Sequence, residues 1–149
     1  MNFKGQTLRS LDSKGRLMLT PEMRDQLTVD AGPGKVTLTY YDGCVAGFPM
    51  SEWAAIEAQM SKVRNPSRKL RNFIRVFISG AEEVTLDKQG RITIPAHLRK
   101  RAKLDKDTVL AGVGNRIEIW DNHEYDLLLE DDYDDVSDDL SDSGVELSI

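Results

Sequence analysis

The chain contains an internal duplication, which limits the folds it can adopt more than any other feature. Residues 11–19, Leu-Asp-Ser-Lys-Gly-Arg-Leu-Met-Leu, recur 75 positions later as residues 86–94, Leu-Asp-Lys-Gln-Gly-Arg-Ile-Thr-Ile. A second correspondence, at an offset of 72, pairs residues 46–48 with residues 118–120. Two copies of about 50–60 residues are too few and too long for a solenoid, which stacks many shorter repeats. The sequence therefore predicts two similar modules in tandem.

Charge is distributed unevenly along this duplicated chain. Residues 130–149 carry nine Asp and Glu and no Lys or Arg, so the formal net charge of −5 combines a basic body of net +4 with an acidic tail. Basic surfaces pair with phosphates, and runs of like charge are typical of solvated ends. We divide the chain into a first module (1–61), a basic linker with a central helix (62–80), a second module (81–129) and an acidic disordered tail (130–149).

Each module is predicted to run hairpin, short helix, hairpin, helix. Apolar and polar residues alternate in residues 84–86 and again in 92–94, which is typical of half-buried strands, and the Asp and Gly between them favour a turn. Pro21 and Pro95 stand where the short helices can begin. The second hairpins are expected at residues 36–41 and 44–48 around Asp42-Gly43, and at residues 108–113 and 117–120 around Gly114-Asn115.

Longer helices complete this plan. Ser51 is a candidate N-cap for a helix that ends the first module, with Trp53 on its apolar face. Between the modules, a helix capped by Ser67 is expected to stop at Ser79-Gly80. The apolar stripe of this central helix is predicted to comprise Leu70, Phe73, Ile74, Phe77 and Ile78.

The repeated Asp-x-x-Gly-Arg signature, at residues 12–16 and 87–91, resembles that of MraZ, a family of bacterial transcription factors. Members consist of two tandem SpoVT/AbrB-like swapped-hairpin modules. Two copies of the signature at this spacing are much more specific than one. Other similar segments extend the resemblance over nearly all of residues 1–125: Asp42-Gly43-Cys44, Phe48-Pro49, Glu52-Trp53, and residues 77–81 and 112–121.

The resemblance implies a mainly β fold with capping helices (α+β-like), a double-split β-barrel in which the two AbrB-like modules complete each other. It also implies a cytoplasmic, nucleoid-associated regulator without cofactors. Such a regulator binds short direct repeats in double-stranded DNA ahead of the operon for cell division and wall synthesis. Its homo-oligomer is expected to be a ring of eight or twelve subunits. Three features depart from the family pattern: Thr20-Pro21 at the position of Pro95, Gly47 in a strand that is normally bulkier, and the long acidic tail.

The resemblance implies DNA contact by the arginines that end the two signatures, Arg16 and Arg91. Arginine stays charged at any working pH and can place two hydrogen bonds on a guanine edge or a phosphate, and a two-stranded ribbon can enter the major groove. One alternative is that each arginine only forms a salt bridge with its signature aspartate, worth about 0–1 kcal/mol when exposed. The residues expected to shape the turns are Asp12, Gly15, Asp87 and Gly90.

Lys14, Lys88 and Arg9 flank the signatures and are candidate phosphate contacts. Solvated strand positions are the near-equal alternative for all three. Two further basic clusters, in residues 62–75 and 99–106, are typical of solvated faces, although in a ring they could meet acidic residues of the neighbouring subunit.

An enzyme is not expected, and neither a catalytic nor a metal site is predicted. The two histidines, His97 and His123, lie on different predicted segments and have no cysteine partners at metal-binding spacing. Cys44, the single cysteine, excludes an internal disulfide and is expected to be a small, half-buried strand residue. The sequence contains no run of about 18 apolar residues, the length that a membrane-spanning helix needs. Residues 1–5 lack the apolar segment of a secretory signal.

A second hypothesis is a protein-interaction module, like the antitoxins that share the swapped-hairpin fold and hold a partner protein with an acidic disordered tail. Hydrophobic residues spaced along the tail could fold onto such a partner. Two complete modules, each with a signature, favour the DNA-binding hypothesis, because such antitoxins usually have one. The spaced hydrophobic residues are Leu140, Val145, Leu147 and Ile149.

Overall fold

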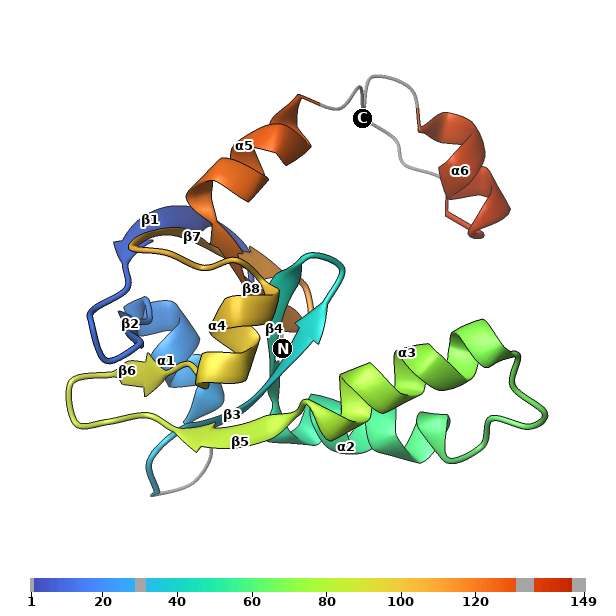
Figure 1. Ribbon diagram of the computed structural model, residues 1–149, viewed down its shortest axis with the longest axis horizontal. Coiled ribbons are helices and arrows are strands. Elements are labelled where there is room, and N and C mark those ends of the chain that lie inside the picture. The colour runs from blue at the N-terminus through green and yellow to red at the C-terminus, as the bar shows by residue number, and fades with distance from the viewer. Residues whose placement is uncertain (1, 29–31, 131–135, 146–149) are drawn as a thin grey trace.

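The computed structural model describes residues 2–28, 32–130 and 136–145. Within these ranges the chain forms a β-rich body with helices around it (Figure 1). The elements are β1 (Gln6–Ser10), β2 (Arg16–Met18), α1 (Pro21–Leu27), β3 (Lys35–Tyr41), β4 (Cys44–Pro49), α2 (Met50–Met60), α3 (Arg68–Ser79), β5 (Glu82–Thr85), β6 (Arg91–Thr93), α4 (Ala96–Arg101), β7 (Asp107–Val113), β8 (Arg116–Asp121), α5 (Asn122–Leu129) and α6 (Ser137–Asp142).

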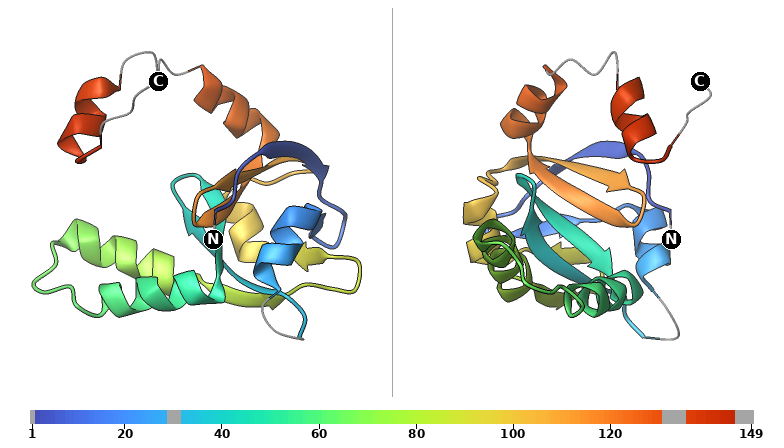
Figure 2. Two further views of the ribbon diagram at one scale, coloured as in Figure 1. Left: turned by 180° about the vertical axis from the view of Figure 1, so that it is seen from behind. Right: turned by 90° about the vertical axis from the view of Figure 1, so that its right-hand side faces the viewer.

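The described strands form two antiparallel sheets. Six of them lie in the order β1-β7-β8-β4-β3-β5, and β2 pairs with β6 in a separate two-stranded ribbon. The order of the large sheet is symmetric with respect to the repeat, because β1, β7 and β8 are the equivalents of β5, β3 and β4. Figure 2 shows the large sheet curving around the ribbon, α1 and α4.

The strand register confirms the duplication. In the ribbon, Leu17 pairs with Ile92, its equivalent at the offset of 75. At the centre of the large sheet, Ala46 pairs with Glu118, its equivalent at the offset of 72. Because a residue that pairs with its own equivalent lies on a twofold pseudo-symmetry axis, the two halves of the chain are arranged in each sheet like the subunits of a twofold dimer.

The first hairpin predicted in each module is wrong. β1 pairs with β7 rather than β2, β5 pairs with β3 rather than β6, and β2 and β6 pair with each other. The signature turns therefore connect strands of different sheets. Alternating burial predicts that a segment is a strand, but it does not identify the partner, which here comes from the other half of the chain.

The second hairpin of each module is confirmed. β3 pairs with β4 and β7 with β8. At the β3–β4 turn, Asp42 and Gly43 both have positive φ (52° and 93°), as the tight two-residue hairpin turn requires. Gly47, the residue noted as a departure, lies opposite Ile117, and a Cβ there would come within 2.8 Å of the Ile117 Cγ1 atom. The lack of space explains the glycine in this strand.

The main core lies between the large sheet and the layer made by the ribbon, α1 and α4. Leu17 and Ile92 of the ribbon are fully buried against Leu38 and Leu110 of the large sheet and Leu98 of α4. Both short helices are therefore held on the same side of the large sheet as the ribbon. This packing places the signature turns at the ends of a rigid layer.

Helices α2, α3 and α5 cover the opposite face of the large sheet. Trp53 of α2 and Phe77 of α3 pack with Phe48 of β4. Tyr125 of α5 packs with Trp120 of β8 in a separate cluster. Trp53 and Tyr125 are equivalents at the offset of 72, so these two clusters follow the same pseudo-symmetry, whereas α3 belongs to the linker between the modules.

The helix starts agree with the sequence in part. Ser67 caps α3 as predicted, accepting a hydrogen bond from a first-turn N–H at 3.1 Å, and Thr20 caps α1 in the same way at 3.2 Å. The prediction that Ser51 caps α2 is wrong, because that helix begins at Met50 directly after Pro49 and has no side-chain cap bond. The chain passes from β4 into α2 without a loop, so no residue is free to act as the expected cap.

The fold is mainly β with several helices, as expected. Strand pairing among the described residues does not close the two sheets into one barrel. Segment 130–149, predicted to be disordered, contains the short helix α6. Residues 131–135 and 146–149, with the hydrophobic Leu147 and Ile149, lie outside the described residues. In the part of the chain that the structure describes, no helix is long and apolar enough to cross a membrane.

Candidate nucleic-acid interface

The outward face of the ribbon carries both signature arginines. Arg16 pairs across the ribbon with Thr93, and Met18 pairs with Arg91. Directly paired residues of an antiparallel ladder point to the same face, and so do residues two apart on one strand. Arg16 and Arg91 therefore occupy diagonal positions on one narrow, two-stranded surface, while the residues between them fill the core.

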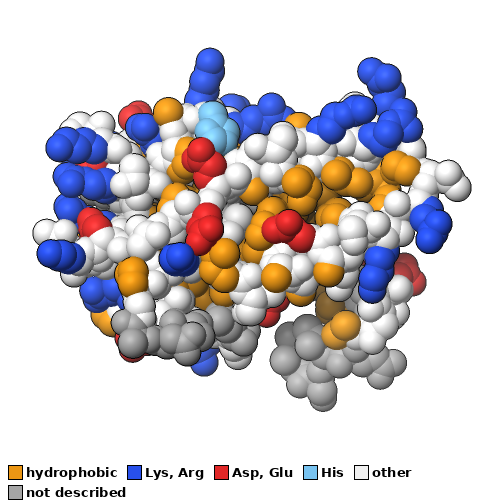
Figure 3. Space-filling model, turned by 90° about the horizontal axis from the view of Figure 1, so that it is seen from below, with side chains coloured by type: hydrophobic (Ala, Val, Ile, Leu, Met, Phe, Trp, Pro, Cys, Tyr) orange, Lys and Arg blue, Asp and Glu red, His pale blue; other side chains and the backbone are white. Residues whose placement is uncertain are grey.

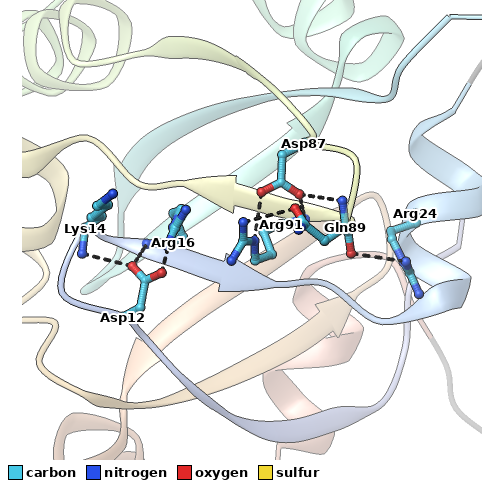
Figure 4. Close-up of polar contacts among 7 residues, drawn as sticks. All are labelled: Asp12, Lys14, Arg16, Arg24, Asp87, Gln89 and Arg91. Carbon is cyan, nitrogen blue, oxygen red and sulfur yellow. Dashed lines mark hydrogen bonds and ion pairs between the residues drawn. The ribbon is translucent and has the colours of Figure 1, made fainter.

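Asp12 fixes both the first turn and its arginine. Oδ1 accepts hydrogen bonds from the backbone N–H groups of Lys14 (2.9 Å) and Arg16 (2.8 Å), and Oδ2 accepts one from Nε of Arg16 at 2.6 Å (Figure 4). Gly15, at φ 80°, donates its N–H to the Asp12 carbonyl at 3.0 Å. The Arg16 side chain is 33% exposed, and no partner for its terminal nitrogens is found among the described residues.

Asp87 repeats this arrangement in the second turn. Oδ1 accepts from the N–H groups of Gln89 (2.9 Å) and Arg91 (2.8 Å), and Oδ2 accepts from Nε of Arg91 at 2.8 Å. Nη2 of Arg91 donates a further bond to Oε1 of Gln89 at 3.0 Å. The first turn has Lys14 at the position of Gln89. The second guanidinium is therefore held on two sides, and the lysine of its turn, Lys88, stands one position earlier than Lys14 does in the first, so the two signatures are not equivalent.

Both signature aspartates are held in the ionised state. The backbone hydrogen bond from Arg16 is the main cause that lowers the pKa of Asp12, and the guanidinium of Arg16 acts in the same direction against partial desolvation. The pKa of Asp87 is lowered in the same way by Arg91. The two ion pairs that orient the arginines therefore persist throughout the neutral pH range. The salt bridges that the alternative invokes are present in both turns, and they are compatible with DNA contact.

Each signature turn also bonds to the other half of the chain. The Gly15 carbonyl accepts a hydrogen bond from the N–H of Ile94 at 2.8 Å, and the Gly90 carbonyl accepts one from the N–H of Leu19 at 3.2 Å. These four residues are two pairs of repeat equivalents. The two turns are consequently fixed by one symmetric set of bonds that crosses between the modules.

Two arginines that the sequence analysis did not assign to the site pack against the turn glycines. A Cβ on Gly15 would lie 2.8 Å from Nε and Cζ of Arg99, and a Cβ on Gly90 would overlap Cδ of Arg24. Nε of Arg99 donates to the Ile94 carbonyl at 3.0 Å, and Nη1 of Arg24 lies 3.4 Å from the carbonyl oxygen that precedes Gly90. Arg24 and Arg99 are equivalents at the offset of 75, which is the one sequence signal of a shared role.

The structure brings the predicted lysines, but not Arg9, to the same loops as the signature arginines. Lys14 and Lys88 are exposed in the two turns. Arg9 lies on β1, in the large sheet, where it pairs with Thr108. This register directs Arg9 to the inner face of the sheet, and its Nε is buried without a hydrogen-bond partner among the described residues.

The residues considered for other chemistry are placed apart from this surface. Cys44 is fully buried beside the Tyr41 carbonyl, rather than half-buried as expected, and desolvation raises the pKa of its thiol strongly. His97 and His123 are exposed on two different helices, α4 and α5. Among the residues described, no cluster of three or more His, Cys, Asp or Glu side chains could hold a metal ion.

A second basic surface lies on the linker helix α3. Part of the predicted apolar stripe of α3 is open to solvent, and Figure 3 shows apolar side chains gathered on this side of the molecule with lysines and arginines around them. A cavity of about 310 Å³ between α3 and the β3–β4 turn is lined by Tyr41, Phe73 and Arg101, among others. The exposed residues of α3 include Arg68, Lys69, Leu70, Arg71, Phe73, Arg75 and Val76.

Comparison with known proteins finds close relatives along the whole chain. The family described as "MraZ protein, putative antitoxin-like" matches residues 2–73 and 77–143. Proteins named "Transcriptional regulator MraZ" are 62% identical in Maridesulfovibrio salexigens and 47% identical in Nitratidesulfovibrio vulgaris strain Hildenborough. These alignments cover 99% and 98%, respectively, of both chains. A relative with the same name in Lactobacillus delbrueckii subsp. bulgaricus is 41% identical over 94% of this chain and 97% of its own.

The sequence predicts that this chain is not an enzyme. The names of the relatives agree with this prediction, because they are names of transcriptional regulators. The resemblance stated from the two signatures is confirmed by matches that span both halves of the chain. The chain belongs to the MraZ family.

Proposed function

We propose that this protein is a sequence-specific DNA-binding transcriptional regulator that reads direct repeats in double-stranded DNA as a ring-shaped homo-oligomer. Its target is the region ahead of the operon for cell division and wall synthesis, and its location is the cytoplasm, at the nucleoid. The ribbon and the large sheet correspond in this proposal to the parts of a double-split barrel. The relatives' name supports the regulator, and the ribbon supports the way it contacts DNA.

The observation that carries the proposal is the pair of oriented arginines on the outward face of the ribbon. In each, Nε is bonded to an aspartate that is ionised at neutral pH. This bond fixes the plane of the guanidinium, and the terminal nitrogens of Arg16, which have no partner among the described residues, remain free to donate to guanine O6 and N7 or to two phosphate oxygens. A ribbon of two strands is narrow enough for the major groove.

The basic loops add sequence-independent attraction. Lys14 and Lys88, which are exposed in the two signature turns, would neutralise phosphates on either side of the groove that the arginines enter. For each phosphate that the protein neutralises, the logarithm of the DNA-binding constant falls by about 0.9 for every tenfold rise in salt concentration. One ribbon contacts few bases, so a ring that presents many ribbons to repeated DNA sites gains affinity through effective concentration.

Two different surfaces on the described chain support ring assembly. Helix α3 exposes apolar and basic side chains, and α5 exposes apolar and acidic ones, with Leu127 44% and Leu129 63% accessible beside Asp126. These surfaces are complementary in charge and both carry unburied apolar residues. Contact between α3 of one subunit and α5 of the next is head-to-tail, and head-to-tail contacts close into rings when the rotation between subunits allows it.

The DNA-binding proposal is tested by footprinting on the upstream region of the operon at two salt concentrations. We expect protection of regularly spaced repeats that weakens steeply as salt rises. Protection that is insensitive to salt, or spread evenly over unrelated DNA, contradicts the proposal.

The ring proposal is tested by sedimentation of charge-reversed variants. Arg71→Glu together with Arg75→Glu is expected to dissociate the ring into smaller species, and adding Asp126→Lys and Glu130→Lys is expected to restore it in part. An unchanged sedimentation coefficient for the first variant would remove α3 from the subunit interface.

A protein partner of the acidic tail is the second candidate function. The described part of the tail exposes Val136 and Val145 beside its aspartates, which would suit a basic partner with an apolar groove. A pull-down with residues 130–149 alone, set beside the footprint of the full chain, separates this function from DNA binding.

A further inference from the structure

We propose that Arg99 and Arg24 are positioning residues that act across the two modules. Arg99, in the second module, sets the conformation of the first signature turn and hence of Arg16. Arg24, in the first module, does the same for the second turn and Arg91. The DNA-binding consequence of this inference rests on the function proposed above, whereas its structural consequence does not.

The contacts at Gly15 carry the first half of the proposal. The guanidinium of Arg99 lies so close to Gly15 that a methyl group there would come within 2.8 Å of Nε and Cζ. Arg99 is itself held by its bond to the Ile94 carbonyl at 3.0 Å, and the N–H of Ile94 bonds to the Gly15 carbonyl at 2.8 Å. Gly15 is thus held by a flat cation, Arg99, and by the backbone of Ile94, directly after β6, both from the other module.

The contacts at Gly90 carry the second half. Arg24 reaches from α1 to the turn, with Nη1 3.4 Å from the Gln89 carbonyl, and its aliphatic stem occupies the space above Gly90 (Figure 4 shows Arg24 beside Gln89). The N–H of Leu19 bonds to the Gly90 carbonyl at 3.2 Å. The hydrogen bond from Arg24 to the Gln89 carbonyl (3.4 Å) is longer than the one from Arg99 to the Ile94 carbonyl (3.0 Å). The second turn therefore depends more on its own hydrogen bond between Gln89 and Arg91.

The chemistry requires arginine rather than any cation. In each contact, the planar face of the guanidinium or its aliphatic stem packs against a turn glycine. One guanidinium N–H also donates a hydrogen bond to a backbone carbonyl. Lysine offers a point charge on a flexible stem. At position 99 it reproduces neither the flat surface nor the Nε donor, and at position 24, where Nε has no hydrogen-bond partner among the described residues, it lacks the Nη1 donor. A residue that only attracted phosphate would be replaced well by lysine, so the Arg99→Lys variant separates positioning from simple charge.

Hydrogen exchange of the full-length protein tests the inference without DNA. In Arg99→Lys, amide exchange in residues 12–16 is expected to accelerate by about tenfold, the effect of losing one ordinary interaction, while residues 87–91 exchange as in the parent. Arg24→Lys is expected to give the opposite pattern. Arg101→Lys is the matched control, because Arg101 lies on the same helix and packs over Tyr40 instead of a signature turn. Equal acceleration in both turns, or in neither, overturns the inference.

A double-mutant cycle on repeat DNA tests the functional consequence. Arg99→Lys is expected to lower affinity about tenfold, to add little further loss in an Arg16→Lys background, which keeps the charge and a measurable affinity but loses the guanidinium, and to keep its full effect in an Arg91→Lys background. If Arg99→Lys binds DNA like the parent, its role in binding is charge alone and the functional half fails. Should Arg99→Lys not fold, Arg99→Gln, which keeps a planar donor, is measured in the same cycle. If no variant or parent binds the repeats while the exchange pattern holds, the proposed function fails and the positioning role stands.

Discussion

A side chain that reads a base edge must keep its orientation while it leaves water. Arg16 and Arg91 meet this requirement through Asp12 and Asp87, whose carboxylates hold both the backbone of the turn and Nε of the arginine. These ion pairs are partly exposed, and solvent-exposed ion pairs contribute little to stability. Their main effect is therefore on the geometry of the arginine rather than on the free energy of folding.

Arg16→Ala is expected to abolish specific binding to the repeats while leaving fold and assembly unchanged. Losing one bidentate contact between an arginine and a base costs about 1–3 kcal/mol of binding free energy, and a ring loses this contact at every subunit. Gel shift on cognate and scrambled repeats, with sedimentation of the same sample, measures both effects. Arg64→Ala is the charge-matched control, because Arg64 lies in the exposed connection between α2 and α3, at the far end of the molecule from the ribbon (Figure 1). Retained affinity for the repeats would remove Arg16 from the interface.

Gly90→Ala is expected to lower the melting temperature more than Gly114→Ala. Both glycines have positive φ, 81° and 67°, which costs alanine about 1–2 kcal/mol. A Cβ on Gly114 meets no atom within 4 Å, whereas one on Gly90 overlaps Arg24. The difference between the two melting temperatures therefore measures the space that Arg24 fills. Equal losses would show that only the backbone angle matters.

Acidification is expected to weaken the turns in a defined direction. The folded-state pKa values of Asp12 and Asp87 lie below the ordinary value of 3.8, so their contribution to stability is complete above that value and is lost as pH falls through the lowered pKa. Urea unfolding at about pH 5 and about pH 2.5 should show a smaller difference for the double variant Asp12→Asn and Asp87→Asn than for the parent. An equal difference would assign the acid sensitivity to other carboxylates.

At the level of elements, sequence patterns predict what is local. The hairpin around Asp42-Gly43 and the helix start at Ser67 are confirmed because a two-residue turn and a cap bond are decided within a few residues. The prediction that β1 and β2 form a hairpin is wrong, because the partner of each strand depends on burial over the whole sheet. The contact of Arg99 with Gly15 could not be predicted for the same reason, since it exists only in the exchanged arrangement.

Leu17→Ala is expected to destabilise the ribbon and with it both signatures. Leu17 is fully buried and pairs with Ile92 at the pseudo-symmetry axis, and truncating a buried leucine costs about 2–5 kcal/mol. Because the residue serves both halves, hydrogen exchange should accelerate in residues 12–16 and 87–91 together. Leu8→Ala, at a β1 position that is 71% exposed, is the control and should leave the melting temperature nearly unchanged. Acceleration in one turn alone would show that the ribbon does not unfold as a unit.

At the level of the whole molecule, the two halves form one structure rather than two independent domains. The large sheet combines strands from both halves, with the edge strand of each half paired to the hairpin of the other, and the turns of each half are held by the other. This arrangement gives every subunit one ribbon with two arginines instead of two separate single-arginine hairpins. The difference between Lys14 and Gln89 makes the two ends of the ribbon unlike, which on the proposed direct repeats would give the ribbon a direction.

We propose that the acidic tail sets how much of the basic body is available to DNA. The body of net +4 would attract any phosphate backbone, and the nine carboxylates of residues 130–149 would compete with DNA for the same lysines and arginines. Deletion of residues 130–149 is therefore expected to raise affinity for unrelated DNA at low salt by more than it raises affinity for the repeats. The difference should disappear as salt shortens the range of the electrostatic field to about 8 Å at 0.15 M. Fluorescence anisotropy with both DNAs across a salt series measures this.

A variant in which the tail aspartates are replaced by asparagine separates the effect of charge from that of chain length, because it should behave like the deletion if charge is the cause. Unchanged affinity for unrelated DNA at low salt would leave the tail without a role in selectivity and strengthen the case for a protein partner.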